Sequence, residues 1–365
     1  MKTTKFYFAI TALSLMAWSC SNKNELSQGT LQSSFSSNSQ SLSSAMNTIS
    51  SSTAYQVLTN SDGATTLGAL KVSAQSTSAV VLDSISLSDI TGVYDFNKSK
   101  SSKKWNPSLL NFFTKTADSS IMVVRLPAEK VRNPRSLLIY SPSDSALTNN
   151  YIFSLSDYKY RFNFNQWDYH MASTINIKGV DAGALNIQSS NSRSNGYQFG
   201  SGFAFSNGYD AKCIYKTGDS VVSIYSISKE SKVLYEEKFT AIKSPVMGGR
   251  HREREYSLTI GDVQITRKPG MNSLDSAKVY VAGVLQSKSK VEMVDQQTDS
   301  VETSITNHKR ELKITFDDGT SATVTQLLGN ATLENIRTLF VSLRQTYFAT
   351  SIVDKIAGDI YRSKK

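Results

Sequence analysis

The longest regular feature of this sequence is an alternation of apolar or aromatic residues with polar ones at a period of two. It runs from YKYRFNFNQW, which begins at residue 158, to KVLYEEKFTAI, which ends at residue 242. Successive side chains of a strand point to opposite faces, so the pattern is typical of strands with one buried face. Turn residues interrupt it about every ten residues, and TGDS at residues 217–220 predicts a hairpin. We therefore expect a mainly β chain of the α+β class, built on an antiparallel, sandwich-like sheet rather than on βαβ units.

The chain is long enough for one large core or two modest ones. It has 365 residues, of which 39% are hydrophobic and 10% aromatic. One proline and two glycines in SPVMGGR interrupt the alternation near residue 245. The sequence therefore predicts one β-rich domain over residues 54–245 and a β-rich C-terminal region over residues 246–365.

A helix is expected at the C-terminal end, over residues 332–361. Thr332 can cap it, and its apolar residues recur mostly three or four apart. We expect this apolar stripe to pack on the sheet. The stripe comprises Leu333, Ile336, Phe340, Leu343, Tyr347, Ile352, Ile356 and Ile360.

The charged run at residues 250–255 (RHRERE) also fits a strand. In an extended chain Arg254, Tyr256 and Leu258 share one face, while Glu253 and Glu255 share the other. The charges then neighbour one another on a strand, which we favour over an anion-binding site.

The N-terminus has the pattern of an export signal over residues 1–19. Lys2 and Lys5 precede an uncharged apolar segment, and small residues stand before Cys20. The apolar segment is shorter than the roughly 20 residues that a membrane span requires. The Ser-rich stretch at residues 20–53 has little apolar surface, so we expect a flexible tether there.

Cys20 follows a small residue at the expected cleavage point, in the stretch AWSCSN. This resembles the lipobox of bacterial lipoproteins, although Ala17 stands where that family usually has Leu. The resemblance implies that Cys20 is acylated and anchors an exported protein to a membrane, for which we expect the outer membrane. An ordinary signal peptidase would cut the same bond and leave Cys20 unmodified. Cys213, the second of two cysteines, lies in an expected strand and fits a core position.

The export signal, the Ser-rich stretch, the Tyr-rich strands and phrases such as DSISLSDITGVYDF resemble uncharacterised lipid-anchored envelope proteins of Bacteroidota. Exported proteins of that group carry O-linked glycans on Asp-Ser/Thr followed by a small or aliphatic residue. The resemblance therefore implies glycosylation at such triplets in this chain, in exposed turns. Their serines are Ser84, Ser145, Ser220, Ser276 and Ser300.

Charge and motifs argue against several classes of function. The net charge is +10, of which Lys2 and Lys5 of the signal segment supply two, and the remaining cations are mostly scattered. We expect no nucleic-acid partner, because no nucleic-acid-binding motif is present. The three histidines, His170, His251 and His308, lack metal-ligand spacing, so we expect no metal site and no cofactor.

No catalytic motif is visible either, so we expect a protein that is not an enzyme. In QWDYH, Asp168, Tyr169 and His170 are adjacent and would alternate between the two faces of a strand rather than converge. A hydrolase whose carboxylates come from distant strands stays an open alternative.

Aromatic residues suggest a second kind of function. Trp167, Tyr169, Tyr197 and Phe203 lie in segments rich in Asn, Gln and Gly, and sugar rings stack on such side chains. The simpler interpretation is that they line a sheet core. We therefore expect a non-enzymatic envelope protein that binds or scaffolds glycans or another envelope protein. The alternative is a surface glycan-binding accessory lipoprotein of a polysaccharide uptake system.

Overall fold

The structure is a computed structural model of the chain. It describes residues 30–55, 83–97, 109–132, 146–163, 166–243, 252–268, 277–295, 310–345 and 347–364.

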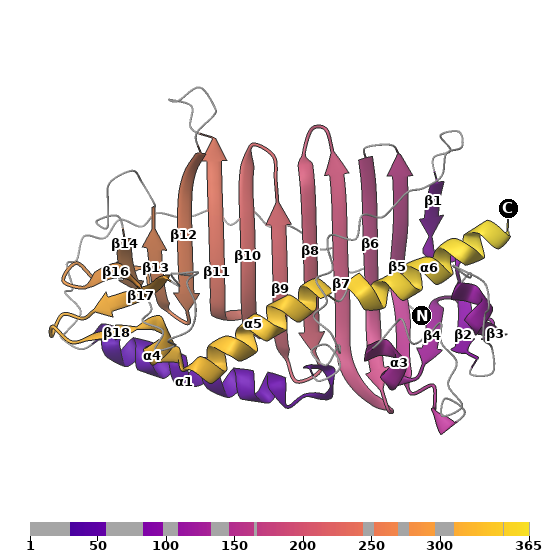
Figure 1. Ribbon diagram of the computed structural model, residues 1–365, viewed down its shortest axis with the longest axis horizontal. Coiled ribbons are helices and arrows are strands. Elements are labelled where there is room, and N and C mark those ends of the chain that lie inside the picture. The colour runs from indigo at the N-terminus through magenta and orange to yellow at the C-terminus, as the bar shows by residue number, and fades with distance from the viewer. Residues whose placement is uncertain are drawn as a thin grey trace, which may run out of the picture.

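Fifteen strands form one large, mainly antiparallel sheet, which confirms the predicted fold class (Figure 1). From β5 to β15 each strand pairs with the next one in the sequence. At the other end β4 pairs with β2 in parallel, β2 pairs with β3, and β1 pairs with β5. The strands are β1 Asp83–Ser86, β2 Gly92–Phe96, β3 Phe113–Ala117, β4 Met122–Leu126, β5 Tyr151–Asn163, β6 Gln166–Ile177, β7 Val180–Ser192, β8 Gly196–Phe205, β9 Tyr209–Lys216, β10 Ser220–Lys229, β11 Lys232–Lys243, β12 Arg252–Ile260, β13 Val263–Arg267, β14 Ala277–Val281 and β15 Val284–Leu285.

A second, three-stranded sheet and several helices complete the fold. The small sheet contains β16 Lys290–Asp295, β17 Arg310–Thr315 and β18 Ser321–Thr323. The helices are α1 Thr30–Ser50, α3 Ala128–Arg132, α4 Val324–Leu328, α5 Asn330–Gln345 and α6 Tyr347–Ser363, with short 3₁₀ turns η1 Leu87–Asp89 and η2 Leu109–Phe112. Helices α1, α5 and α6 run across one face of the large sheet, which we call the helix-bearing face (Figure 1).

The alternation of the sequence sorts side chains between the two faces. On β6, Met171 and Ile175 are buried against the helices, whereas Thr174 is exposed on the opposite face. Burying each such aliphatic side chain contributes roughly 1.5–3 kcal/mol. The predicted hairpin at residues 217–220 is confirmed, because β9 and β10 pair on either side of it. The core therefore lies between the helix-bearing face and its helices.

Residues 30–50 are not the flexible tether that we predicted. They form α1, whose apolar residues recur at helical spacing and are buried: Leu31, Phe35, Leu42, Met46 and Ile49. The helix contacts β11, β12 and β13. One apolar stripe suffices here because tertiary packing, rather than overall hydrophobicity, supplies most helix stability.

Residue 245 is not the domain boundary that we predicted. Strands β11 and β12, which lie on either side of it, pair over nine residues from Tyr235↔Ile260 to Lys243↔Arg252. The proline and glycines therefore fall in a connection between adjacent strands of one sheet, and the large sheet continues past it as far as β15.

The expected C-terminal helix is present as α5 and α6 on either side of residue 346. Thr332 is not its cap, because α5 begins at Asn330. The Thr332 side chain is buried and donates a hydrogen bond to Ser43 Oγ of α1 at 3.3 Å. This hydrogen bond joins α1, from the N-terminal part of the sequence, to α5, from the C-terminal part.

The predicted strand in the charged run is confirmed as β12. Leu258 and Ile260 are 4% and 1% exposed, whereas Glu253 and Glu255 are exposed on the opposite face. Arg254 shares the helix-bearing face with Leu258 but lies nearer the start of the strand, where it is exposed.

Candidate functional site

A pocket of about 450 Å³ lies between the large sheet, the small sheet and helices α4 and α5. A volume in this range is typical of sites for small molecules, which are mostly apolar with a few placed polar groups. The pocket is lined by Tyr235, Tyr256, Leu258, Arg267, Met293, Glu311, Leu312, Val324, Thr325 and Leu333.

Two tyrosines on neighbouring strands form one wall of this pocket and share an acidic partner. Tyr235 Oη of β11 donates to Glu237 Oε2 at 3.2 Å, and Tyr256 of β12 also hydrogen-bonds Glu237. Burial, and then the negative charge of Glu237, raise the pKa of both tyrosines. Their hydroxyl groups therefore stay protonated at neutral pH, and their hydrogens are engaged by Glu237 rather than directed into the apolar space.

Glu311 on β17 forms part of the opposite wall and is engaged by the start of α4. Its Oε1 accepts a hydrogen bond from the backbone N–H of Thr325 at 2.6 Å. That N–H is one of the four at a helix start that lack a partner within the helix. Thr323 and Gln326 form a capping box at the same turn. The carboxylate thus serves the local structure of α4 as well as lining the pocket.

Arg267 is the one cation among the described residues that line the pocket. It ends β13, lies opposite Tyr256 on β12 and is half-buried. Among the described residues, no carboxylate comes within 4.0 Å of its guanidinium to form an ion pair. The pocket therefore combines apolar walls with a positive charge that the surrounding protein does not neutralise directly.

The predicted aromatic residues share the helix-bearing face, but they differ in exposure. Trp167 of β6 and Tyr197 of β8 are half-buried with ring centroids 5.9 Å apart, and Tyr215 of β9 follows at 6.0 Å from Tyr197. Trp167 Nε1 donates to Ser189 Oγ at 3.2 Å. We call Trp167, Tyr197 and Tyr215 the aromatic row.

The other two predicted stacking residues are in the core. Phe203 is 1% exposed and packs on Phe205 at a centroid distance of 4.8 Å. Tyr169 is 8% exposed and donates a hydrogen bond to Asp354 Oδ1 of α6 at 3.1 Å. Their rings meet other protein groups, so within the predicted set only Trp167 and Tyr197 keep partly exposed rings.

Asp354 lies where α6 crosses β5 and β6. It accepts hydrogen bonds from Tyr169 and, at 3.0 Å, from Tyr158, whose ring packs edge-on against that of Tyr169. The residue as a whole is partly exposed, but burial of its carboxyl group raises the pKa of Asp354 to about 7. The two tyrosine hydroxyls act in the opposite direction and lower this pKa in part.

Several predicted residues fall outside the described ranges. These are Cys20 and the serines Ser145, Ser276 and Ser300. Of the remaining glycosylation candidates, Ser84 is exposed on β1 and Ser220 is half-buried at the start of β10. Cys213 lies in β9 and is 2% exposed, as expected of a core residue.

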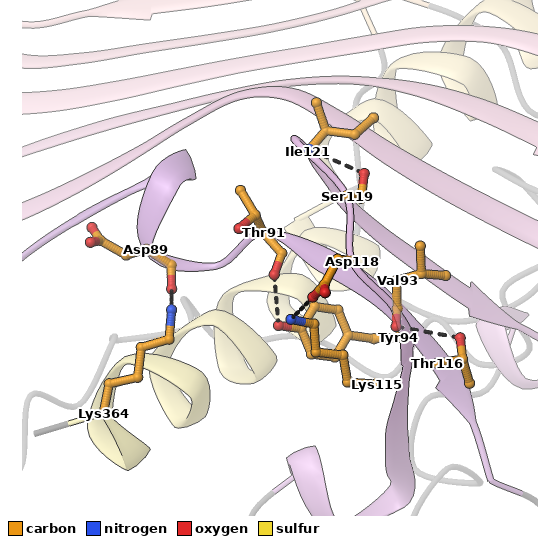
Figure 2. Close-up of polar contacts among 10 residues, drawn as sticks. All are labelled: Asp89, Thr91, Val93, Tyr94, Lys115, Thr116, Asp118, Ser119, Ile121 and Lys364. Atoms are coloured by element: carbon orange, nitrogen blue, oxygen red, sulfur yellow. Dashed lines mark hydrogen bonds and ion pairs between the residues drawn. The ribbon is translucent and has the colours of Figure 1, made fainter.

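A cluster of polar contacts fastens the C-terminal end of α6 at the far end of the sheet (Figure 2). Lys364 Nζ donates to the backbone carbonyl oxygen of Asp89 at 2.6 Å. Nearby, Lys115 and Asp118 form an ion pair at 2.6 Å, with exposed fractions of 48% and 96%. Exposed pairs of this kind contribute little stability. We interpret this cluster as an attachment of the helix rather than a binding site.

Two further observations concern only the described residues. No three His, Cys, Asp or Glu side chains among them are grouped so that they could hold a metal ion. No described helix combines the length with the apolar character that crossing a bilayer requires.

Sequence reasoning missed Arg267 and Asp354. Arg267 ends the alternating run VQITR, and nothing in that run indicates that its neighbours enclose a pocket. Asp354 offered a weak signal, because it stands among the apolar residues of α6 and next to the buried Val353. An acid beside an apolar helical stripe marks a carboxyl group at a buried interface.

No protein-family model, no curated protein and no solved structure matches the chain.

Proposed function

We propose that this protein is a non-enzymatic, lipid-anchored cell-envelope protein that binds an apolar or amphipathic small molecule in the pocket. The observation that carries the binding role is the pocket itself, which has mostly apolar walls from two sheets and two helices. The described residues of its lining include one carboxylate, that of Glu311, and no His or Cys. Such a lining favours retention of a ligand over acid-base or nucleophilic chemistry.

Anchoring is proposed from the sequence around Cys20 and is tested separately from binding. We expect the mature N-terminal peptide to carry acyl groups on Cys20 when analysed by mass spectrometry. We also expect Cys20→Ser to move the protein from the membrane fraction to the soluble fraction. A mature N-terminus that begins at an unmodified Cys20 would contradict the anchor, whatever the pocket binds.

The binding role is tested with a fluorescent amphipathic probe, an anilinonaphthalene sulfonate, and two variants on α5. Leu333→Trp fills the pocket with a larger side chain, so we expect it to lose most probe binding. Val341→Trp places the same side chain on the same helix at a residue that is 44% exposed and outside the pocket lining. This control should bind the probe as the parent protein does. Equal binding by both variants would refute the pocket as the site.

A second candidate function, glycan binding, is favoured by the aromatic row. Three rings from β6, β8 and β9 lie side by side, and Tyr215 is 37% exposed. Aromatic faces of this kind stack against the apolar faces of sugars. If a glycan array identifies a ligand, we expect the Trp167→Ala variant to bind it more weakly than the parent protein does. Tyr280→Ala should bind it unchanged, because Tyr280 is a half-buried ring on β14 that does not belong to the aromatic row. A silent array would rule out this second role.

A further inference from the structure

We propose that the ligand of the pocket is an amphipathic anion, whose carboxylate or phosphate head pairs with Arg267 while its apolar body lies against the two sheets. This inference rests on the proposed function above and names the chemical class of the ligand. It follows from a difference between the charged groups around the pocket: the acids have hydrogen-bond donors from the protein, whereas Arg267 has no carboxylate partner among the described residues.

The two acids at the pocket already have donors from the protein. Glu311 accepts from the backbone N–H of Thr325, and Glu237, which is not among the lining residues, accepts from Tyr235 and Tyr256. Neither acid therefore requires a cationic ligand to satisfy it.

Arg267 is in the opposite situation. It is half-buried at the pocket wall, and no carboxylate among the described residues is close enough to pair with it. A guanidinium presents a planar fork of donors that fits a carboxylate or a phosphate with two parallel hydrogen bonds. An anion from outside the chain is thus the partner that this side chain is best suited to receive.

The rest of the lining selects the other end of the ligand. Leu258 of β12 and Leu312 of β17 are 4% and 9% exposed and face the same pocket from the two sheets. Met293 on β16 adds an unbranched side chain that adapts to irregular apolar shapes. Binding here would remove apolar surface of the ligand from water, which favours a hydrocarbon body over a polar one.

The test compares three ligands with the same hydrocarbon chain on the full mature protein. They are dodecanoate, dodecyl phosphate and the neutral 1-dodecanol, each measured by isothermal titration calorimetry below its critical micelle concentration. We expect at least one of the anions to bind roughly 10- to 100-fold more tightly than the alcohol, as an added charged hydrogen-bond pair allows. The anion that binds more tightly identifies the head group as a carboxylate or a phosphate.

Arg267→Gln removes the charge and retains a shorter, polar side chain. We expect this variant to bind the anions no more tightly than the alcohol, whereas Arg267→Lys should keep part of the preference. Arg254→Gln is the matched control, because Arg254 is exposed on the same face but does not line the pocket. It should keep the full preference for the anion. Circular dichroism and thermal unfolding of each variant establish that it is folded before binding is compared.

The outcomes separate this inference from the proposed function. If the alcohol and both anions bind equally, or if Arg267→Gln keeps the preference, the pocket binds apolar molecules and the role of Arg267 is wrong. If none of the three binds and Leu333→Trp behaves as the parent protein does, the pocket is not a site for amphiphiles and both proposals fail.

Discussion

Asp354 places an ionisable group in the contact between α6 and the sheet, so it couples the fold to pH. Its pKa is about 7 in the folded protein, against an ordinary value of 3.8. Below pH 3.8 the group is protonated in both the folded and the unfolded chain. Between pH 3.8 and 7 the unfolded chain loses this proton first, and the stability contributed by this residue therefore falls as the pH rises.

Asp354→Asn should remove this penalty, because the amide oxygen still accepts hydrogen bonds from Tyr158 and Tyr169 but carries no charge. The change in pKa corresponds to roughly 4 kcal/mol for a fully enclosed group. Partial exposure reduces the expected effect to about 1–3 kcal/mol. We therefore expect the unfolding free energy of the variant, measured by urea denaturation, to exceed that of the parent protein by an amount that grows between pH 4 and pH 8. At the upper end the difference should reach this value.

The control for this measurement is Thr174→Ala, a change at an exposed residue without an ionisable group on the opposite face of β6. We expect the difference between this variant and the parent protein to stay nearly constant over the same pH range. A pH-independent difference for Asp354→Asn as well would show that the buried carboxyl group does not control stability.

Single residues are the level at which the sequence was least informative. The face on which Tyr169 and Trp167 lie follows from the strand period, but their different exposure depends on where α6 crosses the sheet. Arg267 gains its significance from β16, β17 and α4, which come later in the chain. No local pattern around residue 267 contains that information.

At the level of elements, α1 shows how little apolar surface a helix needs when it packs on a sheet. Phe35 of α1 is completely buried, and the helix contacts β11, β12 and β13 together with α4 and α5. Helix α1 also lies close to the turn between β12 and β13, where Asn38 of the helix donates a hydrogen bond to Asp262. Gly261 of that turn has φ +60°, and a Cβ there would lie 2.2 Å from Asn38 Oδ1, so another residue would be strained and would displace the Asn38 side chain.

Phe35→Ala should lower the unfolding free energy by about 3–5 kcal/mol, because it leaves a cavity between α1 and the sheet. Ser36→Ala, at an exposed position of the same helix, should change it by less than about 0.5 kcal/mol. Guanidinium denaturation followed by far-ultraviolet circular dichroism measures both. A small effect of Phe35→Ala would mean that α1 is not part of the cooperative fold.

Strands were predicted more successfully than this helix, for a physical reason. The period-two alternation of β5 to β11 is set by burial on one face, and it is visible within each segment. The α1 segment contains mostly Ser, Asn and Gln, residues that also occur in disordered tethers. Its few apolar residues were sufficient only because a partner surface more than 180 residues away in the sequence covers them.

For the whole molecule, the pairing of β11 with β12 implies that the chain does not divide at residue 245. We expect separately expressed fragments 30–245 and 246–365 to lack cooperative unfolding, since each would expose a long unpaired strand edge and lose helix contacts. The intact chain should show coincident transitions by circular dichroism and tryptophan fluorescence. Cooperative unfolding of fragment 30–245 alone, at the temperature of the intact protein, would restore the boundary.

The sequence predicted the fold class of the molecule but not the continuation of one sheet past residue 245. Short strands with frequent turns predicted an antiparallel sheet, and the strands from β5 to β15 form one by pairing in sequence order. A proline and two glycines near residue 245 are equally compatible with a linker and with a strand connection. Only the pairing partners on the two sides distinguish these cases, and pairing is a property of the whole sheet.

The position of α1 also has a consequence for biosynthesis. The helix leaves the ribosome first, but β11, β12 and β13, on which it packs, follow about 200 residues later, a delay of roughly 10–40 s at ordinary translation rates. An isolated Ser-rich helix of this length is marginal in water, so the segment has no reason to fold during that interval. We infer that α1, the first of the described helices in the sequence, is among the last to dock, and that the chain stays unfinished, and open to chaperones, until β11, β12 and β13 are available.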